Sequence, residues 1–129
     1  MFTIEQIKEA HATVKSGADF PNYIRLLKGL GIRSYIHFVA DGHILYLGVD
    51  DQQLHAPAKW ETVDIADKAA TEDLQHALSI HQQGQTDYLT FCKQAAAAGV
   101  DKWIVDIETM LCTYYNKHEE EMLAEQIPG

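Results

Sequence analysis

The sequence has no apolar run long enough to cross a lipid bilayer, and basic residues are scarce. A membrane-spanning helix needs about 20 consecutive apolar residues, so no membrane segment is expected. The chain has 10 lysines and arginines against 19 acidic residues, and its formal net charge of -9 repels the phosphate backbone of nucleic acids. The N-terminal segment also lacks the basic start and apolar core of a secretory signal. These absences predict a cytoplasmic protein that binds neither membranes nor nucleic acids.

Cysteine is also scarce, because Cys92 and Cys112 are the only two in the chain. Thiols normally stay reduced in the cytoplasm, so no structural disulfide is expected. A thiol can act as a nucleophile. However, Cys92 lies on the small-residue side of a predicted helix, and Cys112 shares a strand face with Met110 and Tyr114. Both positions are typical of a buried, unreactive thiol.

The usual motifs of nucleotide binding and nucleophilic catalysis are absent: there is no GxxxxGK[ST], GxGxxG or GxSxG pattern. Zinc-binding helices place two ligands three or four residues apart, whereas His76 and His81 are five apart. The adjacent carboxylates Asp50 and Asp51 fit turn chemistry better than acid–base catalysis. The sequence therefore predicts no metal ion and no cofactor, and it identifies no catalytic residue.

What is present is the pattern of a folded protein. A chain of 129 residues fits one domain over residues 1–129, since domains of roughly 100–150 residues can bury a core of their own. Four segments combine helical spacing of apolar residues with start and stop signals. They cover residues 4–15, 19–29, 71–82 and 86–98. Thr3 and Gln6 form a capping box before the first, and Thr71 is the expected N-cap of the third.

Strands are predicted where apolar residues alternate. The segments IRSYIHFVA and HILYLGV flank Asp41-Gly42, a pair typical of a two-residue hairpin turn. That turn places Ile36 opposite Leu47 and Phe38 opposite Leu45, on an apolar face that we expect to meet the helices. Further strands are expected at residues 61–65, 102–107 and 110–116, and the C-terminal tail is assigned to a strand. The order ααβββααββ predicts an α+β fold with a mainly antiparallel sheet packed by helices.

The other face of the first hairpin is the candidate ligand-binding site. It carries Tyr35, His37 and Tyr46, and a histidine flanked by phenols can bind a polar aromatic ligand or titrate near neutral pH. The simpler interpretation is that another element covers this face.

The chain resembles a family of small bacterial proteins in several phrases: IKEAHATVKSGADFPNYI, SYIHFVADGHILYLG, PAKWETVDIADKA, and HQQGQTDYLTFCKQAAAAGVDKWIVD with CTYY. This is the YbcV/YdfO-like prophage-associated family, known as domain of unknown function 1398 and sometimes labelled phage envelope protein. The resemblance covers nearly the whole chain. It implies an α+β domain and a prophage or bacterial-chromosome setting, but no reaction, cofactor or catalytic residue.

Three functional hypotheses follow. The preferred one is a non-enzymatic protein of prophage origin, binding or regulatory, that contacts another protein or a second copy of itself. The second is a small-molecule binder or small enzyme that uses Tyr35, His37 and Tyr46. The third is an acidic mimic of nucleic acid, which requires a contiguous acidic stripe, whereas the only acidic run is Glu119 to Glu121. The sequence gives neither the ligand nor the oligomeric state.

Overall fold

Four helices and a six-stranded sheet are present in the computed structural model, which describes residues 2–14 and 19–127. The helices are α1 (Ile4–His11), α2 (Phe20–Gly29), α3 (Thr71–Gln82) and α4 (Tyr88–Ala97). The strands are β1 (Ile32–Phe38), β2 (Ile44–Gly48), β3 (Gln53–Ala56), β4 (Lys102–Asp106), β5 (Leu111–Tyr115) and β6 (Glu121–Gln126). A 3-10 turn, η2 (Val49–Asp51), joins β2 to β3. The predicted α+β class is confirmed.

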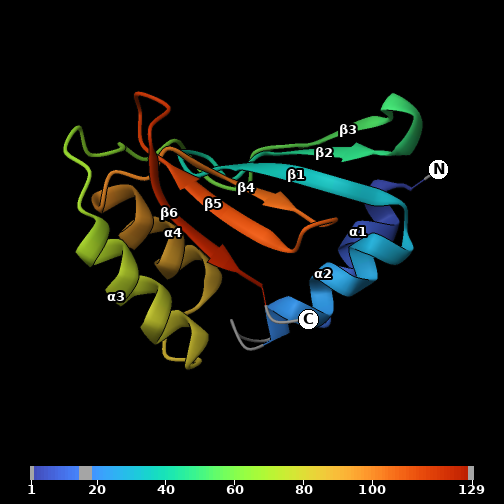
Figure 1. Cartoon of the computed structure of the whole chain (residues 1–129), viewed down its shortest axis with the longest axis horizontal. Helices are drawn as coiled ribbons and strands as arrows, with labels where there is room; N and C mark the ends of the chain where they lie inside the picture. Colours follow the sequence, from blue (N-terminus) through green and yellow to red (C-terminus); the bar gives the residue numbers. More distant parts are fainter. Residues whose placement is uncertain (1, 15–18, 128–129) are drawn as a thin grey trace.

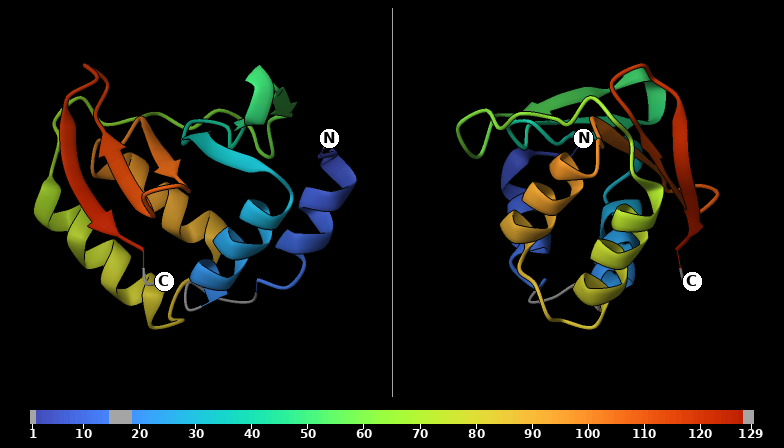
Figure 2. Two further views of the ribbon diagram at one scale, coloured as in Figure 1. Left: turned by 45° about the vertical axis from the view of Figure 1, so that its right-hand side comes forward. Right: turned by 90° about the vertical axis from the view of Figure 1, so that its left-hand side faces the viewer.

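The sheet is built from two meanders of three strands that join at β1 and β4. Its strand order is β3-β2-β1-β4-β5-β6, and each neighbouring pair is antiparallel. Both helix pairs lie on the same face of the sheet (Figures 1 and 2). In Figure 1, α1 and α2 lie on the right, and α3 and α4 lie on the left beneath β5 and β6. The opposite face carries no helix in the part of the chain that the structure describes.

The strand register gathers the inward-pointing side chains into two rows on the helix-covered face, because directly paired residues share a face. The Tyr35 row consists of Leu54, Tyr46, Tyr35, Val105, Cys112 and Glu125. The His37 row consists of Ala56, Ile44, His37, Trp103, Tyr114 and Leu123. Most of these side chains are buried, so the two rows form the middle of the core.

The prediction of which hairpin face meets the helices was wrong. Tyr35, His37 and Tyr46 are 2–3% exposed, whereas Ile36 and Leu45 are only half-buried on the face without helices. An apolar face was expected to turn inward because burying an unpaired polar group is costly. Here two polar groups of the buried face have partners within the core, since His37 Nε2 is hydrogen-bonded to the hydroxyl of Tyr88 and the Tyr46 phenol to that of Tyr23.

The turn of the same hairpin was also misread. Ile36 pairs with Leu45 and His37 with Ile44, a register shifted by two residues from the one predicted. The carbonyls of Ala40 and Asp41 accept hydrogen bonds from the amides of residues 59, 60 and 63. The residues that connect the two strands therefore bond outside the β1–β2 ladder. Because the shift is an even number of residues, the two faces keep their membership.

The expected strand over residues 61–65 does not form. Asp50 and Asp51 adopt left-handed φ angles of 56° and 60°, and the amide of Gly48 bonds to the carbonyl of Gln52. The chain therefore reverses immediately after β2, and β3 is the segment that pairs with β2. Carboxamide and carboxylate residues tolerate this left-handed conformation better than most.

The predicted starts and ends of the helices are confirmed in part. The capping box of α1 is confirmed, with Gln6 N bonded to Thr3 Oγ1 at 3.2 Å, but the helix ends at His11 instead of residue 15. The stop expected at residues 16–17 lies outside the described residues. Thr71 begins α3 without capping it, since Ala70 is the N-cap and offers no side-chain bond. Asp87 caps α4 through a 2.7 Å bond from Thr90 N.

The C-terminal half follows the prediction closely. β4 and β5 form the expected hairpin, and the carboxylate of Asp106 accepts the turn amides of Glu108 and Thr109 at 3.0 and 3.3 Å. The tail forms β6 at the edge of the sheet, which confirms its assignment to a strand. None of the described helices has the length and apolar character that crossing a membrane requires.

Candidate functional site

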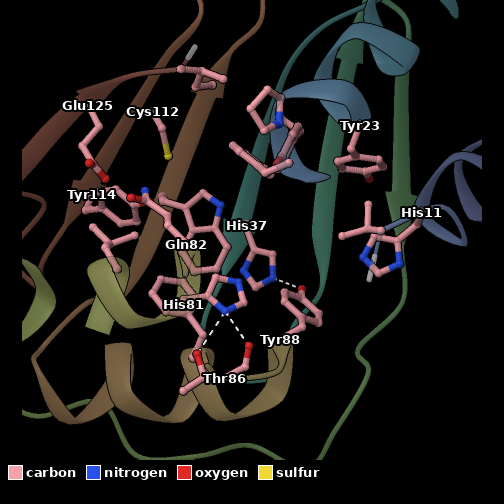
Figure 3. A pocket seen from close by; sticks show the side chains of 18 of the residues that line it. His11, Tyr23, His37, His81, Gln82, Thr86, Tyr88, Cys112, Tyr114 and Glu125 are labelled. Carbon is pink, nitrogen blue, oxygen red and sulfur yellow. Dashed lines mark hydrogen bonds between the residues drawn. The ribbon is translucent and has the colours of Figure 1, made fainter. Parts of the chain in front are cut away.

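A pocket of about 600 Å³ lies on the helix-covered face of the sheet, with walls from all four helices. Part of its floor comes from the two buried rows, through Tyr35 and Cys112 of one and His37, Trp103 and Tyr114 of the other. Figure 3 shows Glu125, Cys112 and Tyr114 at one end, His11 and Tyr23 at the other, and His37, His81 and Tyr88 between them. The pocket is therefore elongated across the sheet.

His37 is the most buried polar side chain of the pocket, at 2% exposed. Its ring stacks on Trp103, with centroids 3.9 Å apart and planes 11° from parallel. Nε2 is hydrogen-bonded to the hydroxyl of Tyr88, while Nδ1 is buried and has no partner. Burial, reinforced by the charge of Lys59, holds the pKa of His37 well below its usual value. His37 is therefore a neutral imidazole with one nitrogen left to bond.

His81 is a second neutral imidazole in the wall. Its Nδ1 lies 3.0 Å from the carbonyl oxygen of Thr86. Since a carbonyl only accepts, Nδ1 carries the proton and Nε2 keeps its lone pair. Burial lowers the pKa of His81, and its ring stacks on Phe91 with a centroid distance of 4.7 Å. This nitrogen can accept a hydrogen bond from a ligand.

The far end is formed by rings from α1, α2 and α4. His11 meets Tyr23 and Tyr88 edge-on, with centroids 5.4 and 5.8 Å apart. Tyr23 shares a hydrogen bond with Tyr46, so both phenols are satisfied inside the core. Burial, together with the charge of Lys59, lowers the pKa of His11. This end is aromatic and carries no formal charge of its own.

A carboxylate defines the opposite end. Glu125 pairs with Cys112 across the β5–β6 ladder and therefore points toward the helices, where it is half-buried. Its side chain interacts with that of Gln82 on α3, and burial raises its pKa. Gln82 is exposed, so the pocket opens to solvent beside it.

Neither cysteine is suited to nucleophilic work. Burial raises the pKa of Cys92 and of Cys112 to about 12, so both stay thiols at neutral pH. Both are buried and free, as the sequence predicted. Cys112 lines the pocket, but as an apolar wall. No group of three or more potential ligands able to hold a metal occurs among residues 2–14 and 19–127.

The structure brings together only part of the predicted site. Tyr35 and His37 line the pocket, whereas Tyr46 lies behind it, bonded to Tyr23. Trp103 and Tyr114, which the sequence analysis did not place in a site, also form pocket wall. Sequence reasoning missed the site role of four further residues: His81, Tyr88, Glu125 and His11. The sequence signal available for this part of the wall was that Cys112 and Tyr114, two residues apart on one strand, share a face.

Comparison with known proteins places the chain among uncharacterised bacterial proteins. It is 28% identical over 107 residues to uncharacterized protein Rv2012 of Mycobacterium tuberculosis (strain ATCC 25618 / H37Rv), which covers 78% of this chain and 62% of that protein. Uncharacterized protein Mb2035 of Mycobacterium bovis gives the same values. Uncharacterized protein YcgX of Escherichia coli (strain K12) is 24% identical over 102 residues, or 79% of this chain and 76% of YcgX. The chain thus spans less than two thirds of its mycobacterial relatives.

The family assignment rests on a match over almost all of the chain. A family model with the description "Protein of unknown function (DUF1398)" matches residues 8–126. This range includes every element of the sheet and three complete helices. The family number is the one that the resemblance of the sequence implied. The chain belongs to this family of proteins of unknown function, DUF1398.

Proposed function

We propose that this protein binds a small molecule in the pocket between its two helix pairs. The observation that carries the proposal is a cavity of about 600 Å³ whose wall combines aromatic rings with a buried, unpaired nitrogen of His37. Ligand pockets commonly measure roughly 300–1,000 Å³ and join apolar walls to a few polar groups. An unpaired polar atom in the core costs about 1–3 kcal/mol, and a ligand or bound water that approaches it can recover that cost.

The wall chemistry indicates the ligand. Trp103, Phe91, Tyr88 and Tyr114 offer ring faces and edges to a planar, mainly apolar body. His81 Nε2 can accept a hydrogen bond from the ligand, because its Nδ1 carries the proton bonded to Thr86. Binding is favoured over catalysis, since burial keeps both thiols protonated and, in the described part of the chain, neither His37 nor His81 is hydrogen-bonded to a carboxylate.

Tryptophol, a neutral indole alcohol, tests this function. We expect saturable binding to the intact chain with a Kd on the order of 1 mM or tighter, about 4 kcal/mol of affinity. Two-dimensional amide NMR should show the largest shifts at Trp103, Tyr88 and Tyr114. Val49→Ala, at an exposed residue far from the pocket wall, should leave those shifts unchanged. Shifts that do not saturate, or that lie elsewhere on the chain, would overturn the proposal.

A second candidate function is self-association through the sheet face without helices. Leu45, Ile36, Ile104 and Thr113 form one row across that face, and the first three are only half-buried. A contiguous, partly exposed apolar surface favours contact with a second copy of the chain. Native mass measurement should then give a dimer that Leu45→Lys dissociates. A monomer at all concentrations would reject this candidate.

Other expectations stay predictions of the sequence. These are the cytoplasmic location, the prophage origin, the regulatory role and the organisation of residues 1–129 as a single domain. Cell fractionation, the genes that flank the coding sequence, and limited proteolysis test them. The acidic-mimic hypothesis has no further support, since described carboxylates such as Glu108, Glu119 and Asp67 are paired with basic residues.

A further inference from the structure

We propose that the ligand of the pocket is a cationic amine with an aromatic or apolar body, and that Glu125 binds its ammonium group. This inference rests on the proposed small-molecule function and adds the chemical class of the ligand. It starts from the position of one carboxylate. Glu125 lies opposite Cys112 on the edge strand β6, on the face that the helices cover, and lines the pocket.

Glu125 has no cationic partner among the described residues. The ion pairs found there join Arg33 to Glu108, Lys102 to Glu119, Lys117 to Asp67 and His43 to Asp41. Glu125 instead interacts with the neutral amide side chain of Gln82. A half-buried carboxylate without a counter-charge is unfavourable, and an ammonium group delivered by a ligand would relieve that cost.

The formal charges around the pocket have one sign. Glu125 and Asp87 line it, and no lysine or arginine does so within the described part of the chain. The buried His37 and the half-buried His81 carry no compensating charge at neutral pH, because burial lowers the pKa of both. An anionic ligand would therefore meet carboxylates and neutral imidazoles only.

The electrostatic potential also differs between the two ends of the pocket. The ammonium of Lys59 bonds to the carbonyl of Gly42 at 2.8 Å and acts electrostatically on His37, in the middle of the pocket, and on His11, at the end away from Glu125. A ligand cation is thus repelled from one end and attracted to the other. The attraction to Glu125 and the repulsion by Lys59 favour a ligand whose amine lies at β6 and whose apolar body lies toward His37.

A continuous series of rings connects the carboxylate to the middle of the pocket. Tyr114 is the ring next to Glu125, and its centroid lies 5.8 Å from that of Trp103. Trp103 in turn stacks on His37 and lies 5.7 Å from Phe91. Aromatic faces attract cations as well as apolar rings, so this wall suits both parts of an aryl-alkyl amine.

Three indole derivatives with similar bodies separate the contributions: tryptamine carries a positive charge, tryptophol none, and indole-3-acetate a negative charge. At pH 7.5 we expect tryptamine to bind the intact chain about tenfold more tightly than tryptophol, the usual size of one charge-assisted hydrogen bond. Indole-3-acetate should bind more weakly than either. Isothermal titration measures the three affinities.

The variant Glu125→Gln removes the charge and keeps the shape, and should bring tryptamine to the affinity of tryptophol. Glu121→Gln is the matched control, because Glu121 is an exposed carboxylate on the same strand that does not line the pocket. It makes the same change in net charge and should keep the tenfold preference. Circular dichroism verifies that both variants fold.

The outcomes distinguish this inference from the function on which it rests. If tryptophol binds and tryptamine binds no better, the assignment of an amine ligand is wrong and the pocket function stands. If the preference for tryptamine survives in Glu125→Gln, the assignment of the ammonium group to Glu125 is wrong and the pocket function again stands. If the preference is lost equally in Glu121→Gln, the effect is general electrostatic attraction and the inference also fails. If none of the three binds, the proposed function itself fails.

Discussion

The burial of His37 predicts a specific loss of stability in mild acid. Its folded-state pKa lies well below the value of about 6.5 expected in the unfolded chain. As pH falls, the unfolded state therefore takes up the proton first. The contribution of His37 to stability is fully present above pH 6.5 and is lost progressively below it. Replacing His37 by phenylalanine removes this dependence while keeping a ring that can stack on Trp103.

The magnitude follows from linkage. For one histidine that titrates at about 6.5 when unfolded and stays neutral when folded, the free energy of unfolding falls by about 1.4 kcal/mol between pH 7.5 and 5.5. His11 and His81 also have lowered pKa values, but they contribute to both the wild type and His37→Phe. The difference between the two proteins therefore isolates His37, provided that its neighbours titrate independently of it.

Urea unfolding followed by far-ultraviolet circular dichroism at pH 7.5, 6.5 and 5.5 measures this difference. At pH 7.5 the variant loses the bond to Tyr88 and relieves the unpaired Nδ1, so its net change should be small, about 1 kcal/mol or less. Between pH 7.5 and 5.5 the wild type should lose about 1.4 kcal/mol more than the variant. His76→Gln, at an exposed histidine of α3, should follow the wild type. Equal losses in wild type and His37→Phe would refute the buried, neutral state of His37.

Three further predictions test the scaffold of the pocket. Asp87→Ala should lower the free energy of unfolding by about 1 kcal/mol, measured by urea titration, because it removes the side-chain cap of α4; an unchanged midpoint would contradict that cap. Gly99→Ala should cost more than about 1 kcal/mol, since φ is +90° and an added Cβ would lie 2.8 Å from Ala69 Cα; a neutral effect would show that this approach is not close. Cys92 and Cys112 should react with a thiol reagent only as fast as the chain unfolds, and rapid labelling of either in the native state would mean that its thiol is accessible.

Local signals in the sequence predicted most elements because their causes are local. The capping box of Thr3 and Gln6 joins residues three apart, and the cap of Asp87 does the same. The hairpin of β4 and β5 depends on a turn whose amides Asp106 binds two and three residues away. Such interactions can be predicted from a few neighbouring residues of the sequence. They fixed the α+β class and the element order without any knowledge of tertiary contacts.

The failures have long-range causes. Alternation in the first hairpin defines two faces, but which one is covered depends on partners far along the chain. His37 is hydrogen-bonded to Tyr88, which lies 51 residues further along the chain. Hydrogen bonds from residues 59–63 hold the turn after Val39 away from the strand ladder. The missing strand at 61–65 has the same origin, because the amides of that segment are used singly, as when Val63 N bonds to the carbonyl of Ala40. A strand ladder would need such bonds in series.

The candidate site shows why chemistry-bearing residues of a core are hard to recognise in a sequence. Tyr35, His37 and Trp103 are buried, and a buried ring is normally read as packing. They line a pocket because two helix pairs, instead of one continuous layer, cover the sheet above the rows. Glu125 lines the pocket because its pairing with Cys112 turns a carboxylate of an edge strand inward. Residues of the same row can therefore either pack against a helix or line a pocket, depending on whether a helix lies directly over them.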